Sequence, residues 1–221
     1  MFALIPLGDA SRRPGQSAVV TILLIAANAF VFLLEMLGGN RFVIRYAAIP
    51  ALILHGHHWN TLLTSMFLHG GWMHIIGNMV FLWAFGPAVE EAMGSFKFLV
   101  FYLCGGGLSM FAWVIAYPGS HAPCLGASGA IAAVMGAFVM LYPHDRIRSL
   151  MVILIFISFV NVPALLLIGF WFVIQIFNFG FVPTSGAGVA YFAHIAGFLF
   201  GVLLAKALAS RPQFSRRASS W

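Results

Sequence analysis

Charged side chains are scarce in this chain of 221 residues. Aspartate, glutamate, lysine and arginine make up 7% of the sequence, whereas hydrophobic residues make up 62%. A soluble domain carries about a quarter charged residues, so the composition excludes an ordinary soluble protein. Apolar runs of roughly 20 residues are typical of helices that cross a bilayer, and the short alternating segments of a β-barrel are absent. We therefore predict an all-α, polytopic membrane protein.

Cysteine is almost absent as well, with two residues in the chain. Cys104 lies inside an apolar run and Cys124 in a predicted loop, near opposite ends of adjacent spans. A disulfide needs α-carbons no more than about 7 Å apart. We therefore expect no bond between them and no disulfide framework.

Six apolar stretches form a predicted six-transmembrane-helix bundle. The predicted spans are residues 18–37, 72–93, 97–117, 127–142, 163–179 and 189–208. They make up one membrane domain, 18–208, between a cytoplasmic N-terminal segment, 1–17, and a basic cytoplasmic tail, 209–221. The first run is long and lacks a clear cleavage site, so we interpret it as a signal anchor. The apolar segment 149–160 is too close to the fifth span to cross separately, and we expect it to be interfacial or extended.

Basic residues are distributed unevenly across this topology. If both termini are cytoplasmic, two arginines lie outside, Arg41 and Arg45, and nine basic residues lie inside. The inner residues are Arg12, Arg13, Lys97, Arg146, Arg148, Lys206, Arg211, Arg216 and Arg217. This is the positive-inside bias, so the net charge of +6 reflects topology and anionic lipid rather than nucleic acid. The short loops favour a bacterial cytoplasmic (inner) membrane.

Polar side chains occur near the starts of the second, fourth and sixth spans, which all run from outside to inside. They are His74, Asn78, Ser128 and His194. Burying such groups in a bilayer costs free energy unless they pair with one another. We expect them to converge on one site in the outer half of the membrane. A transporter or channel would instead carry a polar lining across the whole bilayer.

Small residues favour close packing of two of these spans. They recur at helical spacing as Ala190, Gly197 and Gly201 in the last span, and as Ser128, Ala132 and Gly136 in the fourth. Small residues let membrane helices approach closely, and a serine hydroxyl must come within about 2.6–3.2 Å of a histidine nitrogen to be activated by it. The alternative is that these residues only pack helices and that Ser128 caps one.

The polar set has the chemistry of a nucleophilic site. A hydroxyl at the first turn of a helix lies beside free backbone N–H groups and the positive end of the helix dipole, which can hold an oxyanion. His74 and Asn78 are four residues apart, so they share a helical face and add donors. Glu35 is the only carboxylate at a compatible depth, so we expect a Ser–His dyad. We expect His69 to be structural.

Three motifs, in this order on even-numbered spans, closely resemble the rhomboid intramembrane serine proteases. They are "HGGWMHIIGN" (69–78), "GASGA" (126–130) and "AHIAGFLFG" (193–201), with "FGPAVEEAMG" (85–94) ending the second span. The resemblance implies Ser128 as nucleophile and His194 as general base. It also implies an oxyanion hole of His74, Asn78 and the Ser128 backbone N–H. The supporting positions are Gly126, Gly129, Gly197, Gly201 and Ala190. The implied reaction is hydrolysis of peptide bonds in or next to transmembrane segments of membrane proteins.

The sequence departs from this family in two places. Asn60 follows Trp59 where many members carry a Trp-Arg pair, and Ala132 stands where some members have a tyrosine that stacks on the catalytic histidine. What orients His194 is therefore open. The alternative function is a non-catalytic rhomboid-like protein that binds transmembrane helices, although such relatives typically lack the serine or the histidine.

Two further segments raise functional questions. The histidines of "HGHHW" (55–59) have no carboxylate or cysteine beside them, so a solvated loop is favoured over a zinc site. We expect no metal and no cofactor. By the same resemblance, the phenylalanine-rich stretch 170–179 is a candidate lateral gate for substrate, with lipid contact as the alternative. The glycine-rich loop that follows it could act as a cap.

Overall fold

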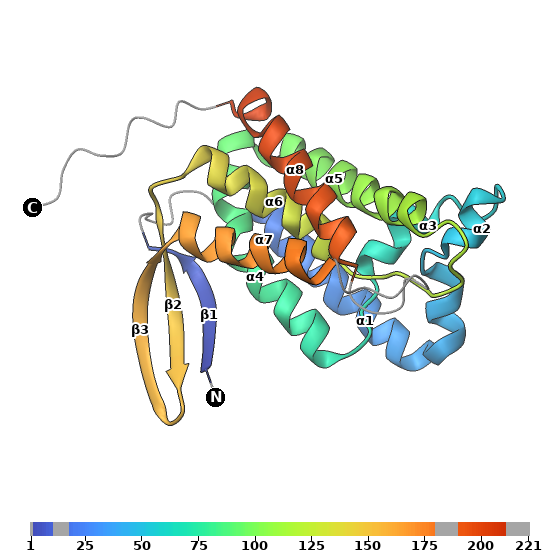
Figure 1. Ribbon diagram of the computed structural model, residues 1–221, viewed down its shortest axis with the longest axis horizontal. Helices are drawn as coiled ribbons and strands as arrows, with labels where there is room; N and C mark the ends of the chain where they lie inside the picture. The colour runs from blue at the N-terminus through green and yellow to red at the C-terminus, as the bar shows by residue number, and fades with distance from the viewer. Residues whose placement is uncertain (1, 11–17, 180–189, 211–221) are drawn as a thin grey trace, which may run out of the picture.

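Six helices form the body of the protein in the computed structural model, which describes residues 2–10, 18–179 and 190–210 (Figure 1). They are α1 (Val19–Tyr46), α4 (Trp72–Met93), α5 (Ser95–Ala116), α6 (Ser128–Leu141), α7 (Ala164–Phe179) and α8 (Tyr191–Leu208). Each helix matches one predicted span. The longest, α1, breaks at Gly39, where φ is 60°, close to the predicted end of the first span. Within the described ranges, four helices are long and apolar enough to cross a membrane, and α6 and α7 are shorter apolar helices.

The short helix α6 lies at the centre of the bundle. Every residue from Gly129 to Phe138 is buried. At about 1.5 Å per residue its length is roughly 21 Å, less than the ~30 Å hydrocarbon core of a bilayer. A helix enclosed by other helices does not need to reach both membrane surfaces. Ser128, the first residue of α6, is therefore held within the protein.

Close contact between α6 and α8 depends on glycine. A methyl group added at Gly201 of α8 would overlap the carbonyl oxygen of Ala133, and one added at Gly197 would overlap the carbonyl oxygen of Gly129. Gly136 of α6 makes the reciprocal approach to the carbonyl oxygen of Phe198. The backbones of the two helices are thus in van der Waals contact, as the small-residue pattern predicts.

The connection between α1 and α4 holds the segment that leads into α6. It contains α2 (Pro50–Leu54), α3 (Thr61–Thr64) and a 3₁₀ turn, η1 (Ser65–Phe67). An isolated antiparallel bridge pairs Ala48 with Cys124, and the Gly126 N–H donates to the Ser65 carbonyl oxygen at 2.9 Å. These backbone bonds fix the approach of the chain to Ser128.

A three-stranded antiparallel sheet lies at the opposite end of the bundle from α2 (Figure 1). Its strands are β1 (Phe2–Asp9), β2 (Arg146–Ile153) and β3 (Phe156–Pro163), in that spatial order. The expectation of an all-α chain missed this sheet, although an extended 149–160 was one of the two expectations for that segment. A short apolar run does not distinguish a strand from other structures, and β1 finds its partner β2 far away in the sequence.

Glu90 of α4 supplies the cap that α1 lacks. The N-cap residue of α1, Ala18, makes no side-chain hydrogen bond. The Glu90 carboxylate instead accepts the Val20 N–H at 2.9 Å and the Thr21 N–H at 2.8 Å. It also accepts the Thr21 hydroxyl at 2.8 Å and the Ser95 hydroxyl at 2.7 Å. The buried side chain is therefore well hydrogen-bonded, which explains the first glutamate in "FGPAVEEAMG".

Candidate active site

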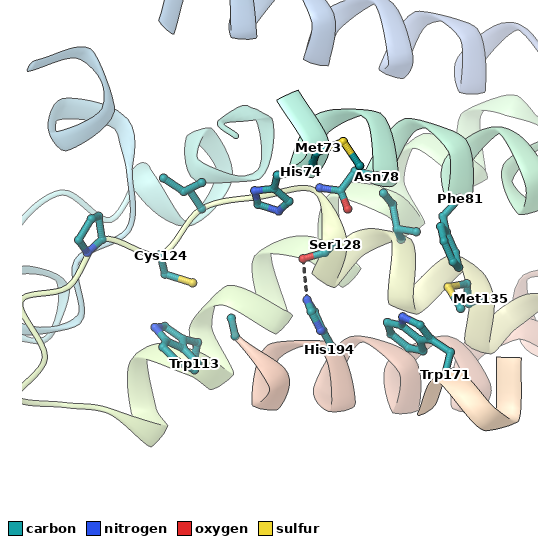
Figure 2. Close-up of a pocket in the computed structure, with 15 residues that line it drawn as sticks. Met73, His74, Asn78, Phe81, Trp113, Cys124, Ser128, Met135, Trp171 and His194 are labelled. Carbon is teal, nitrogen blue, oxygen red and sulfur yellow. Dashed lines mark hydrogen bonds between the residues drawn. The ribbon is translucent and has the colours of Figure 1, made fainter. Parts of the chain in front are cut away.

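The side chains of Ser128 and His194 meet between α6 and α8 (Figure 2). Ser128 Oγ lies 2.7 Å from His194 Nε2. This distance lies within the range over which a base can take a proton from a hydroxyl, about 2.6–3.2 Å. His194 is 7% exposed, so water has little access to compete for this hydrogen bond.

A pocket of about 710 Å³ lies over this pair. His74, Asn78, Ser128 and His194 all line it, so the four polar residues that the sequence places at one depth do come together. Its other lining residues shown in Figure 2 are mostly apolar or aromatic: Met73, Phe81, Trp113, Cys124, Met135 and Trp171. The pocket is thus bounded by α4 on one side and by α7 and α8 on the other, and a small polar centre lies within an apolar lining.

Two side chains from α4 provide hydrogen-bond donors near Ser128. His74 Nδ1 accepts the Gly70 N–H at 3.3 Å, so in the neutral ring Nε2 carries the hydrogen. A methyl group added at Gly126 would lie 2.9 Å from His74 Nε2 and 3.6 Å from Ser128 Oγ. The nitrogen of Asn78, Nδ2, is buried without a hydrogen-bond partner among the described residues. Both side chains line the same pocket as Ser128, which begins α6 and so lies beside the free N–H groups of that helix.

The supporting small residues lie around the pair. Gly126 has φ +126° and leaves room for His74. A methyl group at Gly129 would overlap the side chain of Ser109 on α5. Ala190, the N-cap residue of α8, lines the pocket. Gly197 and Gly201 bring α8 to the backbone of α6, as described above. Each of these positions has little or no room for a larger side chain, except Ala190, where the pocket opens.

Cys124 is the other side chain of the pocket with nucleophilic chemistry. It lies in the loop before α6 and is 7% exposed. Burial raises the pKa of its thiol to about 12. Since the thiolate is the reactive form of cysteine, Cys124 is an apolar wall of the pocket rather than a candidate nucleophile. Both cysteines are free thiols.

Sequence reasoning missed Gln175 of α7. Gln175 Oε1 lies 2.8 Å from His194 Nδ1, the ring nitrogen that faces away from Ser128. Gln175 is 5% exposed. The sequence did contain a signal, a single glutamine within the apolar stretch "FWFVIQIFNF". An amide in a membrane helix needs a hydrogen-bond partner. Nothing in the sequence indicates how α7 is rotated about its axis, so the partner could not be predicted.

His69 and Glu35 make no hydrogen bond to the Ser128–His194 pair that the structure records. Glu35 Oε2 accepts the backbone N–H of His69 at 2.9 Å, so this carboxylate holds the segment before α4. The His69 ring packs edge-on against His74, with centroids 5.0 Å apart. Burial, with a smaller contribution from His74, lowers the pKa of His69 to about 4, so its ring is neutral. Gly180, Gly186 and Gly188 of the expected cap lie outside the described residues.

Comparison with known proteins agrees with the motifs. Residues 56–211 match the family model of the rhomboid domain, so the chain belongs to the rhomboid family, whose fold is a polytopic bundle of membrane helices. The predicted family and the predicted fold class, a polytopic helical membrane protein, are thereby confirmed, with the small sheet as an addition to it.

The similar proteins include a protease and several proteins named rhomboid-like. The chain is 33% identical over 219 residues to rhomboid protease GluP of Bacillus subtilis, covering 94% of this chain and 39% of that protein. It is 35% identical over 137 residues to the mitochondrial presenilin-associated rhomboid-like protein of Bos taurus, covering 60% and 35%. It is 27% identical over 214 residues to the chloroplastic rhomboid-like protein 11 of Arabidopsis thaliana, covering 93% and 71%. The chain thus spans well under half of the first two relatives.

Proposed function

We propose that this protein is an intramembrane serine endopeptidase that hydrolyses peptide bonds in or next to transmembrane segments of membrane proteins. The observation that carries the proposal is the 2.7 Å contact between Ser128 Oγ and His194 Nε2 inside a pocket bounded by apolar helices. A nucleophile and a base in hydrogen-bond contact are the minimum for covalent hydrolysis. Similarity to a protein named a rhomboid protease supports the same activity.

In this mechanism His194 carries one proton from Ser128 to the leaving amine and later one proton from water back to Ser128. His194 Nε2 takes the hydroxyl proton while Ser128 Oγ attacks the scissile carbonyl carbon, and the carbonyl oxygen becomes an oxyanion. The oxyanion then reforms the carbonyl as the C–N bond breaks, and the imidazolium gives its proton to the leaving amine. Water, deprotonated by His194, next attacks the resulting ester and releases a carboxylic acid and the free serine.

The donors around the serine fit the oxyanion. His74, Asn78 and Ser128 line the same pocket, which supports His74 Nε2–H, Asn78 Nδ2 and the Ser128 backbone N–H as the donors for that charge. Asn78 is informative, because its buried amide nitrogen has no partner within the described part of the chain, and such a group costs free energy in the resting protein. A donor kept free for the transition state accelerates catalysis more than one already engaged, and losing one such donor typically costs about 10²–10³ in kcat.

The remaining proposals concern location. We propose a bacterial inner membrane with both termini in the cytoplasm, an orientation that the positive-inside bias supports. The pocket would then lie in the outer half of the membrane. Substrates would then be transmembrane proteins cut near that outer face, with membrane lipid around the bundle.

Labelling with a fluorophosphonate probe tests the proposal without knowledge of the substrate. We expect one adduct on Ser128 by mass spectrometry and no adduct in Ser128→Ala. In His194→Ala we expect the labelling rate to fall by a factor of about a thousand at least. The matched control is Ser109→Ala. Ser109 is also buried, but its hydroxyl donates to the Gly105 carbonyl oxygen at 2.6 Å, so this variant should label like the parent.

The opposite result would favour the non-catalytic alternative. If the folded parent, reconstituted in lipid, forms no adduct on Ser128, the protein does not use this serine as a nucleophile. Binding of transmembrane helices without cleavage would then be the better description.

A further inference from the structure

The His194 ring is hydrogen-bonded on both sides, to Ser128 of α6 through Nε2 and to Gln175 of α7 through Nδ1. We propose that Gln175 is the positioning residue of the site. It fixes His194 in the tautomer that accepts the Ser128 proton, so the reactivity of Ser128 depends on α7 lying against α8. This inference rests on the proposed function and adds to it a residue and a dependence on one helix.

The directions of the hydrogen bonds follow from the donors present. Gln175 Nε2 donates to the Trp171 carbonyl oxygen, one turn earlier in α7, at 3.0 Å. This bond turns Oε1 toward His194 Nδ1, 2.8 Å away. An amide oxygen only accepts, so Nδ1 carries the hydrogen of the neutral imidazole. The lone pair is therefore on Nε2, which faces Ser128 Oγ at 2.7 Å.

The burial of Gln175 supports this role. The buried residues of α7 are Ala164, Ile168 and Gln175, and most of the others face outward. A buried amide is costly unless its polar atoms are hydrogen-bonded. Both ends of the Gln175 amide are paired, one within α7 and one with His194. The side chain is thus held in a single orientation before any substrate arrives.

A second contact from α7 acts on the same ring. The Trp171 ring lies 5.7 Å from the His194 ring, centroid to centroid, with their planes 36° apart. Ala132 of α6, one turn after Ser128, carries only a methyl group and is fully buried. The sequence left open what orients His194 when residue 132 has no ring. The geometry points to Trp171 and Gln175, two residues one turn apart on α7.

The chemistry of an amide suits this position. When His194 takes the serine proton, its Nδ1–H···O bond to Gln175 becomes charge-assisted and strengthens. An amide oxygen does not take that proton away, so the second proton stays on Nε2 for the leaving amine. Gln175 therefore holds the orientation and tautomer of the histidine, as the aspartate does in a Ser-His-Asp triad, but it carries no charge.

Removing the acceptor tests the proposal. Gln175→Met keeps the length of the side chain, and Gln175→Leu is a second variant in case one misfolds. On a transmembrane substrate we expect kcat to fall about ten- to a hundredfold with KM within about twofold, because a charge-assisted hydrogen bond is lost in the transition state. Gln175→Glu keeps an acceptor oxygen and should recover most of kcat. Asn178→Leu, a polar-to-apolar change on the same helix away from the lining of the pocket, is the matched control and should behave like the parent.

Nitrogen-15 NMR of the His194 ring gives a readout that fold stability alone does not move. In the parent we expect a protonated Nδ1 and an unprotonated Nε2, assigned by comparison with His194→Ala. In the Met and Leu variants we expect a mixture of the two tautomers.

The outcomes separate this inference from the proposed function. An unprotonated Nδ1 in the parent, or parental kcat and tautomer in both acceptor-free variants, would overturn the role of Gln175 and leave the protease intact. A parent that forms no adduct on Ser128 would overturn the protease. The parent's own NMR spectrum would still decide whether Gln175 fixes the ring.

Discussion

The two sides of the His194 ring belong to parts of the molecule that are built differently. On one side, α6 is buried along nearly its whole length, and glycine brings its backbone into contact with α8. On the other side, α7 buries three residues and exposes large apolar ones such as Phe170 and Phe177. Helices in backbone contact resist separation because no side chain can rearrange to fill a gap. The position of Ser128 relative to His194 is therefore fixed, whereas the orientation of the His194 ring depends on the more exposed helix.

This difference bears on how a substrate helix could enter. A lateral opening requires some helix to move, and α7 has the fewest buried residues of the helices that line the pocket. If α7 moves, Gln175 and Trp171 move with it. The ring would then lose its fixed tautomer while the pocket is open and regain it when α7 returns. Such an arrangement would keep Ser128 poorly activated until a substrate is enclosed.

The largest expected effect comes from disrupting the rigid side of the site, which is the backbone contact between α6 and α8. Gly201→Val would force α8 away from the Ala133 carbonyl oxygen, and we expect a loss of about 3 kcal/mol in the free energy of unfolding. Labelling of Ser128 should also be lost, because α6 and α8 carry the two members of the pair. Thermal unfolding in detergent and probe labelling measure the two effects.

The matched control is Gly169→Val on α7. A methyl group there meets nothing within 4 Å, so the same substitution should leave the melting temperature near that of the parent. Equal stability of the two valine variants would contradict the backbone contact between α6 and α8.

An intermediate effect is expected from loosening α7. The Phe172 ring stacks on Phe198 of α8, with centroids 4.2 Å apart. Phe172→Ala removes this pair, which contributes about 1 kcal/mol beyond its buried area. Amide hydrogen exchange in α7 should therefore become roughly fivefold faster, whereas exchange in α6 and α8 should not change. The control is Phe170→Ala, since Phe170 is 71% exposed. If exchange rises equally in α6, the two sides of the site are not independent.

The sequence predicted the rigid side better than the exposed side, for a physical reason. The positions of Ser128, Gly197 and Gly201 can be recognised in the sequence, because few residue types fit where two backbones touch. His74, Asn78 and His194 stand out as polar groups at one depth of alternating spans. Gln175 has the same chemistry, but its partner depends on the rotation of α7, and an apolar helix with no polar face gives no sign of that rotation. The sheet was missed because β1 and β2 are separated in the sequence by four of the bundle's six helices, α1, α4, α5 and α6.

The smallest expected effect comes from stiffening α7. Gly169→Ala adds a methyl group in open space, and alanine favours a helix interior over glycine by up to about 1 kcal/mol. We therefore expect a melting temperature equal to or slightly above that of the parent and slower amide exchange in α7. Gly136→Ala on α6 is the matched control, because its methyl group would overlap the Phe198 carbonyl oxygen and should lower the melting temperature. The same substitution thus has opposite signs on the two helices, and a drop in stability for Gly169→Ala would mean that α7 is packed as tightly as α6.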